Sequence, residues 1–151
     1  MNYTERDTYG MYKGEDHSGN GEENGAGNGA WRGPKLMGAH TLVGNDVYNQ
    51  SDENLGEIKE IMLDMRTGEV AYAVLSFGGF FGMGEKLFAV PWSALTLDIE
   101  HKRFVLNVNK ERLECAPGFE QDQWPDMADP AWQKDIHAYY GSEPAREVRP
   151  F

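Results

Sequence analysis

The chain has 151 residues, which is the size of one ordinary domain. Its formal net charge is −11, and none of the segments 1–38, 39–112 and 113–151 carries a net positive charge. We therefore expect no direct nucleic-acid binding, because such binding needs basic side chains that neutralise phosphates.

The first ten residues lack the apolar core of a signal peptide, and no apolar run approaches the ~18 residues of a membrane span. We expect a soluble, cytoplasmic protein without membrane insertion. The single cysteine, Cys115, excludes an intramolecular disulfide and a zinc site with several thiolates. No histidine lies near it in sequence, so its thiol is expected to be half-buried and structural in preference to nucleophilic.

Residues 1–38 are predicted to form a disordered arm rich in Gly, Asn and Glu. Such a composition buries too little apolar surface to offset the entropy of ordering. Tyr3, Tyr9, Tyr12 and Trp31 are candidate docking points within this arm, although flexibility without any docking is the favoured interpretation.

Residues 39–112 have the pattern of a small all-β domain. A short β-prone run at 41–49 is followed by apolar runs at 55–65 and 69–77, which the turn Arg66-Thr67-Gly68 joins into a hairpin. Both faces of the run at 69–77 are apolar, which predicts a central strand covered on both sides.

A further strand is predicted at 86–92, where Pro91 should mark its end or an edge position because proline cannot donate a ladder hydrogen bond. A second hairpin is predicted over 95–108 about the polar turn His101-Lys102. Five or six short strands at this spacing favour a small antiparallel β-barrel.

Residues 113–151 are predicted to be a C-terminal extension with a helix at about 129–140 and a frayed tail. Asp129 fits the N-cap, Pro130 the first helical position and Gly141 the stop. A shorter helix of one or two turns is expected after Asn109.

The helix at about 129–140 has one apolar face, formed by Trp132, Ile136 and Tyr139 or Tyr140. A helix this short is marginal alone in water, so that face must dock on another surface. The barrel is the expected surface, and a second subunit is the alternative. Trp132, Tyr139 and Tyr140 are accordingly candidate partner contacts.

The segment Gly79–Gly84 resembles a phosphate-binding loop in its glycine spacing. The next two residues are Glu85 and Lys86, however, and not Lys followed by Ser or Thr. A carboxylate at that place repels phosphate, and the following residues favour a strand and not the required helix. We therefore interpret these glycines as a bend of the barrel wall.

Three large apolar residues interrupt that bend: Phe80, Phe81 and Met83. They can fold over an open end of the barrel, which is the favoured interpretation, or lie exposed. Exposed aromatic residues beside glycines are typical of protein contact sites. The three residues are therefore candidate partner contacts.

No spacing of titratable residues predicts catalysis or a cofactor. Asp98 and Glu100 can share a face of a strand and hold a hard cation weakly, but a solvated hairpin edge is the favoured interpretation. Asp122, Asp126 and Asp129 raise the same possibility, but Asp129 is explained by capping the helix. We expect no enzyme, no cofactor and no metal site.

Three motifs resemble those of the PRC-barrel family: ENLGEI at 53–58, DMRTGEVAYAVL at 64–75 and FAVPWSAL at 88–95. Residues 116–141 are similar to the extension of stand-alone bacterial members, so that the resemblance covers about 40–141. The family is named for the cytoplasmic part of the photosynthetic reaction-centre H subunit, and it also occurs in a ribosome-maturation factor. The resemblance implies a small, strongly bent β-barrel used in assembly, with no catalytic residues.

Together these observations predict a non-enzymatic adaptor that binds a protein partner and self-associates as a homodimer. The motivation for self-association is the exposed strand edges that a small open barrel leaves. An alternative is a role in RNA metabolism or at the ribosome, acting through a basic ribosomal protein. A ligand- or metal-binding barrel is the least favoured function.

Overall fold

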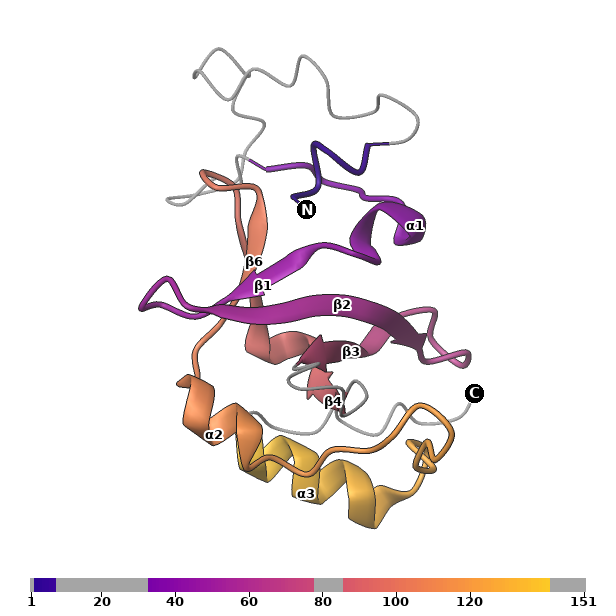
Figure 1. Cartoon of the computed structure of the whole chain (residues 1–151). Helices are drawn as coiled ribbons and strands as arrows, with labels where there is room; N and C mark the ends of the chain where they lie inside the picture. Colours follow the sequence, from indigo (N-terminus) through magenta and orange to yellow (C-terminus); the bar gives the residue numbers. More distant parts are fainter. Residues whose placement is uncertain (1, 8–32, 78–85, 142–151) are drawn as a thin grey trace.

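A computed structural model gives the fold, and it describes residues 2–7, 33–77 and 86–141. The glycine-rich loop with Phe80, Phe81 and Met83 lies outside the described residues. The six strands of the described ranges form one sheet in the order β4-β3-β2-β1-β6-β5 (Figure 1). In chain order the elements are α1 (Ala39–Leu42), β1 (Asp46–Tyr48), β2 (Asn54–Leu63), β3 (Val70–Phe77), β4 (Lys86–Pro91), η2 (Trp92–Ala94), β5 (Leu95–Asp98), β6 (Arg103–Leu106), α2 (Lys110–Glu114) and α3 (Pro130–Tyr140).

The sheet is curled because a very short connection joins its two edge strands. β4 ends at Pro91 and β5 begins at Leu95, with only the single turn η2 between them. Four Cα steps reach at most about 14 Å, whereas the edges of a flat sheet of this width lie roughly 24 Å apart. The sheet therefore curls into an open half-barrel.

Neighbouring strands are antiparallel except for one pair. β1 and β6 run parallel, with Val47 opposite Phe104 and Tyr48 opposite Val105. The prediction of an antiparallel barrel is wrong at this pair, and the sheet is mixed. The reason is η2, which carries the chain from β4 to β5 without reversing its direction, so that β6 points the same way as β1.

Both predicted hairpins are present. β2 pairs with β3 about a turn in which Gly68 has a φ of 77°, and β5 pairs with β6 about a turn in which Lys102 has a φ of 58°. Pro91 is the last residue of the edge strand β4, as predicted. β3 is buried on both faces from Tyr72 to Phe77, which confirms the expected central strand.

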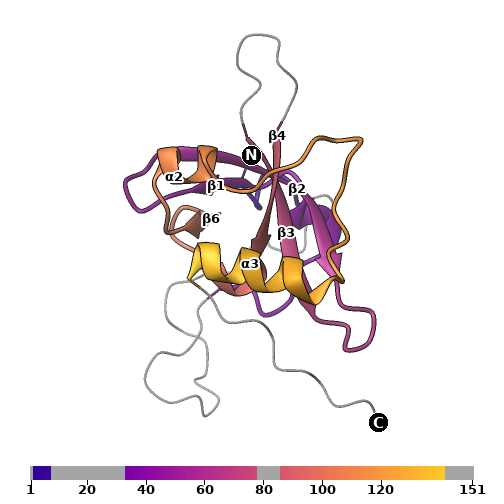
Figure 2. The same cartoon turned by 90° about the horizontal axis from the view of Figure 1, so that it is seen from below.

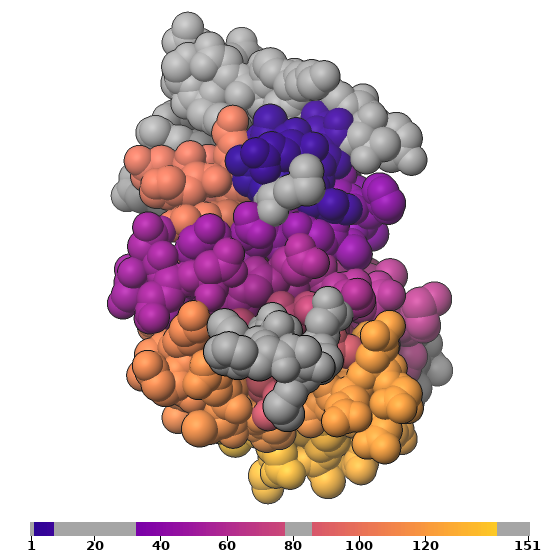
Figure 3. Space-filling view, in the orientation of Figure 1, coloured from indigo at the N-terminus to yellow at the C-terminus, as the bar shows by residue number. Residues whose placement is uncertain are grey.

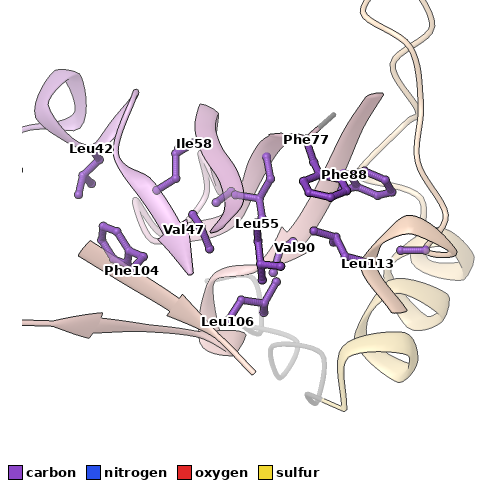
Figure 4. Packing of buried hydrophobic residues seen from close by; sticks show 13 residues of the cluster. Leu42, Val47, Leu55, Ile58, Phe77, Phe88, Val90, Phe104, Leu106 and Leu113 are labelled. Atoms are coloured by element: carbon purple, nitrogen blue, oxygen red, sulfur yellow. The ribbon is translucent and has the colours of Figure 1, made fainter. Parts of the chain in front are cut away.

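The core fills the concave side of the curled sheet (Figure 4). Each strand from β1 to β4 contributes fully buried apolar side chains, and Phe104 and Leu106 of β6 close the cluster. Leu113 from α2 is also fully buried and adds a helical layer to the strands. Burial of apolar side chains in a contiguous cluster of this kind is the largest favourable contribution to the stability of a small domain.

The β-prone run at 41–49 is only partly a strand. Its first residues belong to α1, which ends at Leu42, and β1 starts at Asp46. Asn45 between them is fully buried, and its side-chain amide donates to the Thr41 carbonyl at 2.6 Å. This hydrogen bond satisfies a carbonyl group at the C-terminal end of α1. It therefore favours the helical turn over extended structure at these residues.

α2 begins at the predicted cap, because the Asn109 side chain accepts a hydrogen bond from the Arg112 N–H at 2.7 Å. Cys115, which follows α2, is exposed, so the prediction of a half-buried thiol is wrong. Cys115 is the C-cap of α2, and Leu113 is the residue that this helix buries.

α3 has the predicted ends. The Asp129 side chain accepts from the Ala131 N–H at 3.0 Å, and Gly141 takes the left-handed conformation with a φ of 69°. The helix lies across β3 and β4 (Figure 2), and Ile136 and His137 are its buried residues. The apolar face therefore docks on the barrel of its own chain, as expected.

Candidate functional site

The aromatic residues predicted on α3 all take part in contacts within the chain. The Trp132 ring meets the Tyr72 ring of β3 edge-on at 5.2 Å between centroids. Tyr139 and Tyr140 are half-buried against the core and contact each other edge-on at 5.2 Å. These three predicted partner contacts thus fasten α3 to the barrel, while Phe80, Phe81 and Met83 lie outside the described residues.

A buried polar pair sits at the centre of this contact. His137 Nε2 and the Tyr72 hydroxyl lie 3.1 Å apart, and both residues are less than a tenth exposed. Burial lowers the pKa of His137 below 6.5 and raises the pKa of Tyr72 to about 12. Both side chains are consequently neutral at pH 7, which suits a structural hydrogen bond between a helix and a sheet.

A second polar contact joins α2 to the end of α3. The Arg112 guanidinium donates to the Tyr139 carbonyl at 2.6 Å and stacks over the Tyr139 ring, 4.4 Å from its centroid. In return the Tyr139 hydroxyl donates to the Arg112 carbonyl. The two residues are therefore linked by three interactions.

A groove of ≈ 470 Å³ lies between η2, β6 and the end of α3. Ser93 and Asn107 line it together with Tyr140, whose pKa is raised by burial. No other residue that lines this groove carries a titratable side chain. The groove therefore offers a hydroxyl group and an amide but no acid–base pair.

The carboxylates suggested as a weak cation site have other partners. Asp98 Oδ2 lies 2.8 Å from His101 Nδ1 and 3.6 Å from Arg103 Nε. Burial opposes ionisation of Asp98, but the hydrogen bonds from His101 prevail and lower its pKa. Glu100 is exposed and donates its backbone N–H to Asp98. Within residues 2–7, 33–77 and 86–141, no group of three His, Cys, Asp or Glu side chains is placed to hold a metal ion.

One half of β2 leaves a free strand edge. β1 pairs with β2 only as far as Glu57, and the last ladder-like bonds to this side are made by Ile58 with Gly44 and Asn45. Beyond that point, residues 60–63 pair with β3 on one side and with no described strand on the other. The Ile61 N–H instead donates to the side chain of its neighbour Glu60 at 2.9 Å.

Exposed apolar side chains continue this free edge. Leu63 at the end of β2 is 49% exposed, and Met65 in the following turn is 86% exposed. Ile61 and Met62 are half-buried. We call residues 60–63 together with Met65 the edge surface. The sequence predicts a hairpin for this run but does not indicate that Leu63, the last residue of β2, and Met65, two residues later, are exposed.

The other described edges are better covered. β4 forms a bridge with the segment after α2, where Leu87 and Phe119 exchange backbone hydrogen bonds at 2.9 Å. β5 is only four residues long and ends in Asp98, a charged residue tied to Arg103. Short length and charge are the usual means by which an edge strand avoids pairing. In the edge surface Glu60 supplies charge at one end, whereas Leu63 and Met65 are exposed and apolar.

Residues 2–7 occupy a second surface, at the end of the barrel. Tyr3 is only 1% exposed, and its N–H donates to the Lys102 carbonyl in the β5–β6 turn at 3.1 Å. The Arg6 guanidinium reaches the His40 carbonyl of α1 at 3.4 Å. The segment therefore lies between the β5–β6 hairpin and the residues of α1, where Figure 3 shows it in indigo. The sequence placed Tyr3 in a disordered arm with docking only as the less favoured option; the structure differs at these six residues because the Tyr3 ring is buried.

Comparison with protein families accounts for this architecture. The family model of the PRC-barrel domain matches residues 34–113, which is more than half of the chain. The chain belongs to the PRC-barrel family. The resemblance found in the three sequence motifs is thereby confirmed. Comparison with curated proteins finds no match.

The PRC-barrel match separates the sheet from the segments before and after it. It runs from the residues before α1 to Leu113 in α2, and so includes the whole sheet and the edge surface. Residues 2–7 and α3 lie outside it and both pack against the PRC barrel. No helix in the described ranges has the length and apolar character needed to cross a lipid bilayer.

Proposed function

We propose that this PRC barrel is a non-enzymatic, cytoplasmic protein-interaction module that forms a homodimer through the edge surface. The observation that carries the proposal is the edge at residues 60–63, which pairs with no second described strand and continues into the exposed side chains of Leu63 and Met65. A second copy of the same edge is its simplest partner, because two identical edges pair antiparallel about a two-fold axis.

The chemistry of this pairing follows from the edge itself. The backbone of residues 60–63, which has a ladder only with β3 among the described strands, gains ladder hydrogen bonds from the second copy, and the apolar side chains lose water-exposed area. The Glu60 carboxylate leaves the Ile61 N–H when that N–H joins the new ladder. The dimer would be a continuous sheet through two PRC barrels.

The non-enzymatic part of the proposal is supported by the partners of the perturbed titratable groups. Hydrogen bonds from the Arg66 side chain lower the pKa of Asp64 within the β2–β3 turn. Asp98 is tied to His101 and Arg103 at the β5–β6 hairpin. Each of these groups stabilises a turn, and none of them lines the groove beside Tyr140.

Light scattering over a range of micromolar concentrations tests the homodimer. We expect the wild-type chain to have twice the monomer mass and the double variant Leu63→Glu/Met65→Glu to have the monomer mass. Leu36→Glu is the matched control, because Leu36 is 83% exposed and lies outside the edge surface. A monomeric wild type would overturn the homodimer. A dimer that dissociates with Leu36→Glu and persists with Leu63→Glu/Met65→Glu would overturn the assigned surface.

A further inference from the structure

Residues 2–7 make contacts of the kind that a bound peptide makes. They are joined to the barrel by the backbone bond between Tyr3 and Lys102 and by the Arg6 guanidinium on the carbonyl of His40. The Tyr3 side chain is the buried anchor, at 1% exposure. One aromatic anchor, one main-chain bond and one cation at a carbonyl are a typical recognition set for a short linear segment.

The segment also has a fixed shape of its own. The Asn2 N–H donates to the Glu5 carboxylate and the Glu5 N–H donates to the Asn2 side chain, both at 2.9 Å. The Arg6 N–H donates a hydrogen bond to the Asn2 carbonyl at 3.2 Å. This reciprocal arrangement forms one closed turn that presents Tyr3 and Arg6 to the barrel. A segment with a preferred shape loses less entropy on binding.

The barrel surface that receives Arg6 is shaped for it. Gly44 has a φ of 93°, and a Cβ atom placed there would lie 2.5 Å from the Arg6 guanidinium carbon. The absence of a side chain at Gly44 therefore leaves the space in which the guanidinium lies. We call the surface formed by Gly44, His40 and Lys102 the tyrosine groove.

Twenty-five residues, 8–32, separate this bound segment from the next described residue, Gly33. These residues lie outside the described ranges and belong to the arm, 1–38, for which the sequence predicts disorder; a chain of this length without fixed structure has an end-to-end distance of about 25–30 Å. Such a tether keeps a released segment at an effective concentration on the order of 1 mM beside the groove. If the groove binds this segment with modest affinity, the segment occupies it in most molecules and leaves it empty in a minority.

We infer that the tyrosine groove is a peptide-binding site whose resident occupant is the reversibly docked segment Asn2–Asp7 of the same chain. Release of the segment opens a site for the same chemistry presented from outside: a tyrosine followed three residues later by arginine. The groove holds Tyr3 and Arg6 through the carbonyls of Lys102 and His40, which lie outside the edge surface, so the inference does not rest on the proposed homodimer.

A titration with a synthetic peptide tests the inference. The probe is the acetylated and amidated peptide of residues 2–7, added to the full-length, ¹⁵N-labelled variant Tyr3→Ala, whose own segment has lost its anchor. We expect saturable chemical-shift changes at Gly44 and Lys102. The wild-type chain should bind the same peptide about tenfold more weakly or worse, because its tethered segment competes.

Two control peptides sharpen the titration. Peptides of residues 2–7 that carry Tyr3→Ala or Arg6→Ala should cause no saturable change, since each lacks one recognised group. The inference is overturned if the Tyr3→Ala chain binds no peptide, or if the wild-type chain binds it as tightly as the variant does.

Hydrogen exchange of the unmodified chain keeps the inference testable if the Tyr3→Ala chain does not fold. The Tyr3 amide should exchange through local release of residues 2–7, at least a hundredfold faster than the amides of the central strand β3. Exchange of the Tyr3 amide only at the rate of the β3 amides would show that the segment leaves the groove only on global unfolding, and that result contradicts reversible docking.

Discussion

At the scale of single residues, Gly56 determines how closely β2 and β3 can approach. Its φ is 114°, and a Cβ atom built there would lie 2.1 Å from the Ser76 carbonyl oxygen of β3. The register of the β1–β2 pair also shifts beside it, between Val47 and Tyr48. The bend of the sheet at this position therefore requires a residue without a side chain.

Substitution Gly56→Ala should lower the free energy of unfolding by about 3 kcal/mol or more, from the strained φ and the backbone collision together. Urea unfolding followed by tryptophan fluorescence measures this change. Gly68→Ala is the matched control: its φ is 77° but no atom lies within 4 Å of the added Cβ, so only strain of about 1 kcal/mol is expected. Equal losses in the two variants would contradict the role of close approach.

The sequence revealed the importance of such residues only in part. Gly56 stands inside the motif ENLGEI, which carried the family resemblance, but its collision with Ser76 depends on a contact between two strands. The burial of Tyr3 was equally hidden, because a tyrosine among glycines and acidic residues has no local pattern that indicates a distant groove. The ends of α3 were predictable because Asp129 and Gly141 act on adjacent residues.

At the scale of elements, α3 docks on the sheet through a neutral polar pair. A hydrogen bond between His137 and Tyr72 crosses from this helix to β3. Trp132 packs beside it on the same tyrosine ring. The apolar face of α3 was predictable from its spacing, whereas the pairing of His137 with Tyr72 requires the fold.

Stability should therefore depend on pH on both sides of neutrality. The folded-state pKa of His137 is below 6.5, so its contribution is complete above pH 6.5 and is lost as the pH falls from there through the folded pKa. The folded-state pKa of Tyr72 is about 12, so its contribution is complete below pH 10 and is lost as the pH rises towards 12. We expect a plateau of stability between these limits.

Urea unfolding at pH 5.5 and pH 8 measures the acid side. The loss of stability at the lower pH should be smaller in His137→Asn than in the wild-type chain, whereas His40→Asn, which alters an exposed histidine, should keep the wild-type loss. An unchanged acid loss in His137→Asn would show that another group is responsible.

Among the elements, the hairpins and α3 were predictable and the parallel pair was not. Local turn residues and period-two patterns determine a hairpin, so β2–β3 and β5–β6 were expected. The direction of β6 relative to β1 depends on η2, three residues whose path across the barrel no local pattern indicates. The free edge of β2 was not predictable either, because it depends on where β1 stops pairing with β2.

At the scale of the whole molecule, the net charge opposes self-association. Two copies that each carry −11 repel one another, while the edge surface is largely apolar at Leu63 and Met65. The proposed homodimer should therefore become tighter as salt screens the repulsion.

Raising the ionic strength from about 20 mM to about 300 mM shortens the screening length from about 20 Å to about 6 Å. Sedimentation equilibrium at the two salt concentrations should give a lower dissociation constant for the homodimer at high salt. A contact with a basic ribosomal protein, which is the alternative partner class, would weaken under the same change. A homodimer that dissociates with added salt would contradict an apolar interface.

Hydrogen–deuterium exchange at several protein concentrations tests the pairing of the edge surface most directly. The account predicts that the backbone amides of residues 60–63 become more protected as concentration rises from mostly monomer to mostly dimer, while those of β5 stay unchanged. Amides of residues 60–63 that exchange at the same rate at every concentration, or protection that appears at β5 instead, would contradict it.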